Sequence, residues 1–337
     1  MGERVSTVVR VGVIGAGAMG AAHVETLARW VPEARVSLVH DADRGRATEV
    51  AGTVGAEVAT SSEQLIGSPD VDAVLVAAPD PLHEELALAC LAAGKPTLCE
   101  KPLATSVEGS RRIVEAETAL GRRLVQVGFM RRFDPAYVQL RSTVLSGAVG
   151  ELRAAHCLHR NARAHPDATS EGVLVNSMIH EFDSVPWLLD DPLTAVTVHA
   201  PRVPAGTMQD VQLAVLETAA GRVVTVEVSV NAGYGYDIHT EVVGTEGTAS
   251  LTAPYGTSLR RSGVDGRVVD SDFVVRFVDA YRLELSAWTQ SIVAGSAAGP
   301  SAWDGHLANL AAFAAVESLE SGGRVAVSQE QRPDLYG

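Results

Sequence analysis

Short runs of apolar, β-branched residues alternate with amphipathic stretches over the first 128 residues. The run Val9–Ile14 predicts a buried strand, and residues 18–29 directly after it have helical character. The alternation continues and predicts strands at Val36–His40, Ala73–Ala77, Pro96–Cys99 and Leu124–Val127, with helices at Arg44–Ala51, Pro81–Ala93 and Ser106–Leu120. Strands and helices in turn at this spacing predict a parallel sheet that is covered on both faces.

The pattern changes near residue 128, where longer strands begin to dominate. Val223–Val230 alternates valine with polar residues, which is typical of a sheet with one covered face. Further strands are expected at Leu152–Asn161, Thr194–Ala200, Gln212–Thr218, Ile238–Val243 and Thr248–Thr252, and helices at Pro135–Leu145, Asn176–Leu189, Phe277–Ala294 and Trp303–Leu319. The chain is therefore predicted to be an α/β protein of two domains, 1–128 and 129–337. The second would hold a large open, mostly antiparallel sheet, and its last helix could pack back on the first domain.

Composition and charge exclude several classes of function. The 337 residues include 27 basic and 41 acidic side chains, for a formal net charge of -14, which disfavours a nucleic-acid partner. No basic amphipathic stretch or long apolar span points to a membrane. The three cysteines, Cys90, Cys99 and Cys157, cannot all pair and form no CxxC. We therefore expect a reduced, cytoplasmic protein with no metal site.

A glycine-rich segment follows the first strand and opens the first helix. Gly15, Gly17 and Gly20 form a GxGxxG pattern that also contains Ala18 and Met19, and this predicts a Rossmann dinucleotide site. Asp41 ends the second strand 21 positions after the last glycine, where a carboxylate can bind the ribose hydroxyls. Because this carboxylate would repel a 2′-phosphate, NAD is expected rather than NADP. Arg44 and Arg46 lie close behind it and could offset that preference.

Several segments together resemble the glucose-fructose oxidoreductase and inositol dehydrogenase (Gfo/Idh/MocA) family. The most distinctive is the turn Glu100-Lys101-Pro102, and the others are Ala78-Pro79-Asp80-Pro81-Leu82-His83, Ala93-Gly94-Lys95-Pro96, Gly128-Phe129-Met130-Arg131-Arg132-Phe133-Asp134, His159-Arg160-Asn161, Ile179-His180-Glu181-Phe182-Asp183 and Tyr234-Gly235-Tyr236-Asp237. The later segments look like the inositol 2-dehydrogenase branch.

This resemblance implies both a reaction and a set of cofactor contacts. Family members oxidise a secondary alcohol of a cyclitol or sugar and are commonly tetramers. We expect NAD-dependent conversion of myo-inositol to 2-keto-myo-inositol. Besides the glycine loop and Asp41, the resemblance implies that the cofactor contacts Ala78, Pro79, His83, Glu100 and Lys101.

Oxidation of an alcohol needs a base for the hydroxyl proton and a group that holds the developing alkoxide. Lys101 follows a strand end and is one of only two lysines, so it is the candidate for holding the oxygen. His180 is the candidate base, because an imidazole suits proton transfer near neutrality. Asn176, His180 and Asp183 are spaced i, i+4 and i+7, which predicts that they share one helical face.

Asn176 departs from the family pattern, in which this position is usually aspartate. An amide can orient the imidazole but cannot stabilise its charged form. We therefore hypothesise that His180 is a weaker base here, or that Asn176 suits another substrate. For the hydroxyls of the polyol we expect contacts from Arg131, His159, Asn161, Asn176, His180, Asp183, Tyr234 and Tyr236. The two tyrosines would share one face of a strand if that segment were extended.

Two other interpretations stay open at this level. The substrate could be another inositol isomer, an aminocyclitol intermediate or a pyranose sugar. Alternatively, the chain could be a dinucleotide-binding sensor without catalysis.

Overall fold

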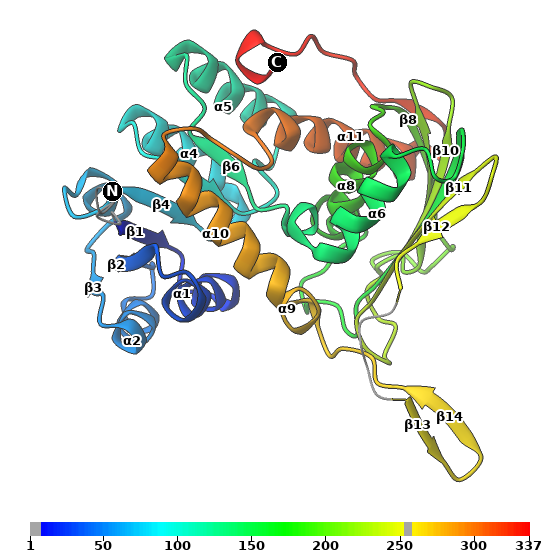
Figure 1. Cartoon of the computed structure of the whole chain (residues 1–337), viewed down its shortest axis with the longest axis horizontal. Coiled ribbons are helices and arrows are strands. Elements are labelled where there is room, and N and C mark those ends of the chain that lie inside the picture. The colour runs from blue at the N-terminus through cyan, green and yellow to red at the C-terminus, as the bar shows by residue number, and fades with distance from the viewer. Residues whose placement is uncertain (1–7, 253–257) are drawn as a thin grey trace, which may run out of the picture. The chain divides into compact units, whose positions relative to one another are not determined.

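The computed structural model describes the backbone of residues 8–252 and 258–337. Its first sheet is parallel and has the strand order β3-β2-β1-β4-β5-β6, with β1 in the middle (Figure 1). The strands are β1 (Val9–Ile14), β2 (Ala34–His40), β3 (Glu57–Val58), β4 (Ala73–Val76), β5 (Thr97–Cys99) and β6 (Val125–Val127). The helices between them are α1 (Ala18–Trp30), α2 (Arg44–Val54), α3 (Ser62–Gly67), α4 (His83–Ala92) and α5 (Val107–Leu120), with 3₁₀ turns η1 (Asp80–Leu82) and η2 (Met130–Phe133). This strand order is that of a Rossmann fold.

The second sheet is mixed but mostly antiparallel, with the order β12-β11-β7-β10-β9-β8-β15. Its one parallel pair is β7 with β10. The strands are β7 (Leu152–Arg160), β8 (Leu193–His199), β9 (Gln212–Thr218), β10 (Val223–Ser229), β11 (Asp237–Gly244), β12 (Thr248–Ser250) and β15 (Val325–Ala326). A separate hairpin is formed by β13 (Ser258–Arg261) and β14 (Val264–Arg267).

Helices make up most of the rest of the second half. They are α6 (Pro135–Leu145), α7 (Ser170–Gly172), the π-helical segment η3 (Val173–Met178), α8 (Ile179–Leu189), α9 (Phe273–Arg276), α10 (Val278–Ala294) and α11 (Ala302–Ser321), followed by the 3₁₀ turn η4 (Asp334–Tyr336). The predicted fold class is thereby confirmed. Among the described residues, no helix has both the length and the apolar character needed to span a bilayer.

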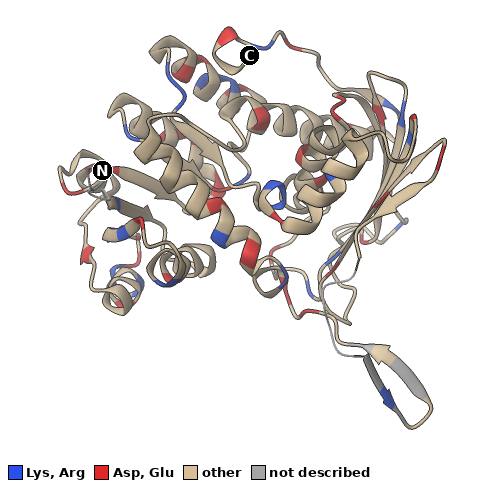
Figure 2. Ribbon diagram, in the orientation of Figure 1, with Lys and Arg blue, Asp and Glu red and all other residues tan. Residues whose placement is uncertain are grey.

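The chain forms two compact units that are not divided at a single point of the sequence. The first unit joins the segment ending at Phe133 to Asp279–Asn309 and Glu330–Gly337, and the second comprises Asp134–Val278 with Leu310–Gln329. Helix α10 belongs to the first unit because it packs into the core of that unit. Its Leu285 and Trp288 are buried in the same hydrophobic core as residues of β1 and β4. Acidic and basic residues are interspersed along the ribbon of both units (Figure 2).

Most predicted elements agree with the structure, because their signals are local. Strands β1 and β9 and helix α6 have the predicted limits. Helix α6 begins where predicted because Asp134 caps it by accepting hydrogen bonds from the Ala136 and Tyr137 amides, with Pro135 in the first turn. The prediction missed several short elements, among them β3, α3, β13, β14 and β15, since such short segments show no periodicity. It was also wrong in treating 176–189 as one regular helix, because η3 precedes α8.

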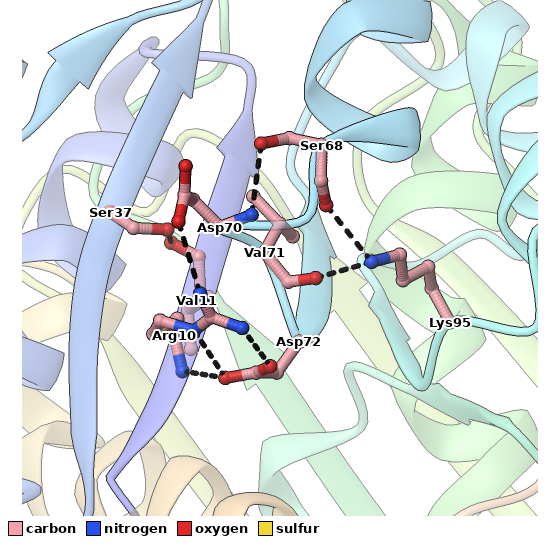
Figure 3. A network of polar contacts seen from close by, with 8 residues as sticks. All are labelled: Arg10, Val11, Ser37, Ser68, Asp70, Val71, Asp72 and Lys95. Atoms are coloured by element: carbon pink, nitrogen blue, oxygen red, sulfur yellow. Dashed lines mark hydrogen bonds and ion pairs between the residues drawn. The ribbon is translucent and has the colours of Figure 1, made fainter.

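Lys95 has a structural contact in the first unit. Its ammonium donates hydrogen bonds to the carbonyl oxygens of Ser68, at 3.1 Å, and Val71 (Figure 3). Nearby, Arg10 of β1 binds the carboxylate of Asp72 through Nε at 3.0 Å and Nη2 at 2.7 Å (Figure 3). These contacts hold the segment that leads into β4. The scarcity of lysine therefore does not by itself mark a catalytic group.

Candidate functional site

Each glycine of the loop between β1 and α1 is required for a different physical reason. Gly15 has φ 96°, and a Cβ there would lie 2.3 Å from the carbonyl oxygen of Ala77 at the end of β4. A Cβ on Gly20 would lie 1.9 Å from the carbonyl oxygen of Gly15, so helix and loop pack without room for a side chain. By contrast, a Cβ on Gly17 would meet nothing within 4 Å. The open space lies at the N-terminus of α1, where the pyrophosphate of a dinucleotide would be expected.

Asp41 follows β2, and both of its carboxylate oxygens are held. Oδ2 accepts a hydrogen bond from the Ala16 amide at 2.7 Å, and Oδ1 accepts one from the Asp43 amide at 2.8 Å. Arg46 lies 3.9 Å from the same carboxylate on a half-exposed side chain. The carboxylate is thus fixed beside the loop, where it fits a ribose and opposes a 2′-phosphate. The residues of this loop fit NAD.

Loops at the ends of β4 and β5 are joined by His83. Its buried ring lies at the start of α4, with Nδ1 2.7 Å from the carbonyl oxygen of Pro102 and Nε2 2.9 Å from that of Ala78. These contacts connect the turn that contains Glu100 and Lys101 to the loop at Ala78. The parallel strands place the cofactor residues predicted from the first domain, Gly15, Gly17, Asp41, Ala78, Pro79, Glu100 and Lys101, in the loops after β1, β2, β4 and β5.

In the second unit, four buried polar and aromatic side chains gather between β7 and α8. His159 of β7 has Nδ1 3.1 Å from Oε2 of Glu181, and its ring centroid lies 6.2 Å from that of His180. Tyr236 packs its ring against His159 with centroids 5.9 Å apart and nearly perpendicular planes. All four side chains are less than one-tenth exposed. A buried set of imidazole, carboxylate and phenol groups can bind several hydroxyls and move a proton.

The other predicted substrate residues occupy varied places. Asp183 is buried on α8 with His180, whereas Asn176 is exposed in the π-helical segment before it. The widened turns of that segment differ from the α-helical spacing on which the single-face prediction for Asn176 depended. Asn161 follows β7, and no described residue hydrogen-bonds to its buried Oδ1. Arg131 belongs to the first unit and is fully buried in η2.

The shared face predicted for Tyr234 and Tyr236 required an extended strand, and the structure forms no strand at these two positions. Neither lies in β11, and Gly235 between them has φ 143°. The hydroxyl of Tyr234 accepts from Arg160 at 3.2 Å, and Tyr234 is 48% exposed, while Tyr236 is 4% exposed against His159. Since His159 and Arg160 are neighbours on β7, their side chains point to opposite faces of the sheet. The two tyrosines therefore contact side chains that point to opposite faces.

Two site residues were missed by the sequence analysis. Glu181 is buried and contacts His159, and His23 of α1 is buried and contacts Glu100 at 2.7 Å. The sequence signal for Glu181 was its charge within the mostly apolar segment 179–189, since a charged residue is rarely buried without a partner. His23 was expected only to cap or pack near the cofactor, and the sequence did not indicate its partner, because Glu100 is 77 positions away.

Together, the fold and the loop define an NAD-binding oxidoreductase. Residues 9–129 match the model of the oxidoreductase family with an NAD-binding Rossmann fold, and residues 137–250 match the GFO/IDH/MocA C-terminal domain. This chain belongs to the GFO/IDH/MocA family.

Individual relatives cover almost the whole chain. Inositol 2-dehydrogenase 1 of Saccharopolyspora erythraea is 50% identical over 334 residues, which are 98% of this chain and 99% of that protein. Inositol 2-dehydrogenase of Streptomyces avermitilis is 44% identical over 337 residues, with 98% of each covered. Among solved structures, myo-inositol dehydrogenase from Lactobacillus casei in complex with NAD(H) and myo-inositol has a TM-score of 0.94 at 35% identity, covering 98% of this chain and all of that one.

Proposed function

We propose that this protein oxidises a secondary hydroxyl of myo-inositol to give 2-keto-myo-inositol. The observation that carries the proposal is the buried cluster of His159, His180, Glu181 and Tyr236, which offers the donors and acceptors that a polyol needs. The Lactobacillus casei relative, whose structure holds NAD(H) and myo-inositol, supports this choice of substrate. NAD, when bound at the glycine loop, supplies the hydride acceptor.

Two side chains carry the chemistry in this proposal. The ammonium of Lys101 holds the substrate oxygen and stabilises the negative charge that develops there. His180 takes the hydroxyl proton while the carbon-bound hydrogen leaves with its electron pair. Asn176 can orient the imidazole but adds no charge of its own, so His180 acts as a weaker base than it would with an aspartate at position 176.

The remaining polar groups bind the hydroxyls of the substrate ring. Glu181 orients His159 by its contact with Nδ1, and the imidazole oriented in this way contacts a substrate hydroxyl. The buried Oδ1 of Asn161 needs a hydrogen-bond donor, and a substrate hydroxyl would supply one. Asp183 and Tyr236 add an acceptor and a phenol. Arg131 is a weaker candidate for substrate contact. Tyr234 is also a weaker candidate, because its hydroxyl contacts Asp237 and Arg160.

The assembly and location of the protein belong to the proposal as well. We propose a homotetramer that uses the open face of the second sheet, where Leu213 and Val223 are exposed on neighbouring strands. A reducing cytoplasm suits the cysteines, which are buried and free in all three places.

The function is tested by mixing the purified protein with NAD and a panel of polyols while NADH absorbance is followed. The panel holds myo-, scyllo- and chiro-inositol and glucose. We expect turnover to be fastest with myo-inositol. Lys101→Met and His180→Gln should each lower kcat by about 10²–10⁴-fold. Their affinity for NAD should remain measurable. NAD binding without turnover of any polyol would instead support the sensor interpretation.

A further inference from the structure

The proposed reaction leaves one buried ionisable pair of the first unit unexplained. His23 on α1 is 1% exposed and Glu100, directly before Lys101, is 7% exposed. The His23 Nε2 and Glu100 Oε1 atoms are 2.7 Å apart. Removing two such groups from water is costly, so the pair adds little stability compared with an apolar contact of the same shape. Its burial therefore points to a role other than stability.

The carboxylate of Glu100 is fixed at both oxygens. While Oε1 faces His23, Oε2 accepts a hydrogen bond from the backbone amide of Lys101 at 3.2 Å. Gly128, after β6, closes the other side, since a Cβ there would come within 3.1 Å of the Glu100 carboxyl carbon. The position of this carboxylate thus determines the backbone at Lys101.

His23 is itself held from the far side. The ring of Tyr281, on α10, meets the His23 ring edge-on with centroids 5.6 Å apart. The imidazole is therefore enclosed between α10 and the end of β5. A contact chain runs from Tyr281 through His23 and Glu100 to the amide of Lys101.

We propose that His23 is a positioning residue, which orients Glu100 and through it aims Lys101 at the substrate oxygen. This inference rests on the proposed function, because it requires Lys101 to act on the substrate. His23 needs no contact with substrate or cofactor for this role.

Charge supports the same role. Burial by itself would raise the pKa of Glu100, but the hydrogen bond and charge of His23, with the charges of Lys101 and His83, hold that pKa below its ordinary value. The Cys99 thiol also lies beside this carboxylate, and its own pKa is raised by burial and by the charge of Glu100. Glu100 therefore remains an anion beside the ammonium of Lys101. Loss of His23 would let Glu100 take up a proton at higher pH.

Two substitutions at His23 distinguish the effect of its charge from the effect of its hydrogen bond to Glu100. His23→Leu removes the hydrogen bond and the charge, and His23→Gln keeps a donor without the charge. With myo-inositol and NAD, we expect His23→Leu to lower kcat by about 10–100-fold, and His23→Gln to lower it less. The dissociation constant of NAD should change by less than about 3-fold, because the pyrophosphate loop is untouched. The acidic limb of the kcat profile, which also reflects protonation of His180, should move to higher pH in both variants because Glu100 then takes up its proton at higher pH.

His306→Gln is the matched control. His306 is also a buried histidine that faces a glutamate, with Nε2 3.0 Å from Oε2 of Glu330, but it contacts Ser110 of α5 instead of a strand-end loop. This variant should lose thermal stability without moving the acidic limb. If His306→Gln moved the limb as far as His23→Gln does, the limb would not report on Glu100 and the positioning role would be wrong.

A double-substitution cycle completes the test. If His23 acts through Lys101, then His23→Gln should cost much less in a Lys101→Arg background than in the natural protein. Additive effects, or His23 variants with kcat within about 2-fold of the natural value and an unmoved limb, overturn the positioning role alone. Full turnover by Lys101→Met would instead overturn the proposed function. His23→Gln keeps the test usable if His23→Leu does not fold.

Discussion

At the scale of single residues, the glycine loop shows how the same amino acid is required for different physical reasons. Gly15 and Gly20 are needed by the protein, since a side chain at either would collide with backbone atoms. Gly17 is needed by the ligand, because nothing in the protein occupies the space beside it. Stability and cofactor affinity should therefore respond differently to substitution at these positions.

Gly17→Val should leave the melting temperature within a few degrees of the natural value and weaken NAD at least about 10-fold, because its side chain fills the space for the pyrophosphate. Gly20→Ala should lower the free energy of unfolding by about 1–3 kcal/mol, because its Cβ forces the helix away from Gly15. Thermal melts and calorimetric titration with NAD measure the two effects. Unchanged NAD affinity in Gly17→Val would contradict the cofactor site.

At the scale of elements, the segment that leads into α8 differs most from its sequence pattern. Residues Val173–Met178 form π-helical turns, and the α-helix begins only at Ile179. Such turns often occur at functional sites. They place Asn176 in a wider turn than His180, so the relation between the two is set by η3 and not by the i to i+4 rule.

Asn176→Asp tests the hypothesis of a weakened base. A carboxylate at this position should stabilise the charged imidazole of His180, so the acidic limb of the kcat profile should move to higher pH. Ser177→Asp is the control, because its carboxylate joins the same segment but points in a different direction. A limb that stays in place in Asn176→Asp would rule out the hypothesis.

At the scale of the whole molecule, buried titratable groups determine the response to acid. Burial lowers the pKa of His306 from 6.5, and the charge of Arg132 with the hydroxyl of Ser301 lowers the pKa of Asp304 despite burial. Because both folded-state pKa values are depressed, their contributions to stability are present at high pH and are lost on acidification.

Stability should therefore fall in two stages as the pH is lowered. The first begins below about pH 6.5, the ordinary pKa of histidine, as unfolding lets His306 take up a proton. The second begins below about pH 4.5, the ordinary pKa of glutamate, for Glu100 and below about pH 3.8, the ordinary pKa of aspartate, for Asp304. Urea unfolding from pH 8 to about pH 3 measures how the free energy of unfolding changes with pH across both stages. His306→Gln should flatten the first stage only, and an unchanged slope in that variant would contradict the assignment.

The assembly proposal also belongs at this scale. Leu213→Asp places a charge on the open face of the second sheet, where the paired residue on β10 is Glu227. Because assembly would have to remove the new carboxylate from water, Leu213→Asp should split the tetramer, while its position on an exposed face should leave each chain folded. Light scattering after gel filtration measures the mass, and circular dichroism checks the fold. A tetramer that survives this change would place the interface elsewhere.

The amino-acid sequence by itself determined the features that depend on neighbours along the chain. The alternation of β-branched strands and helices, the GxGxxG loop and Asp41 at the end of β2 all arise from local patterns, and each lies where it was predicted. Only the tertiary structure decided which distant groups meet. The His23–Glu100 pair joins residues 77 positions apart, and the contact of His159 with Glu181 joins a strand to a helix. Such pairs are set by how elements pack, and no periodicity along one element encodes them.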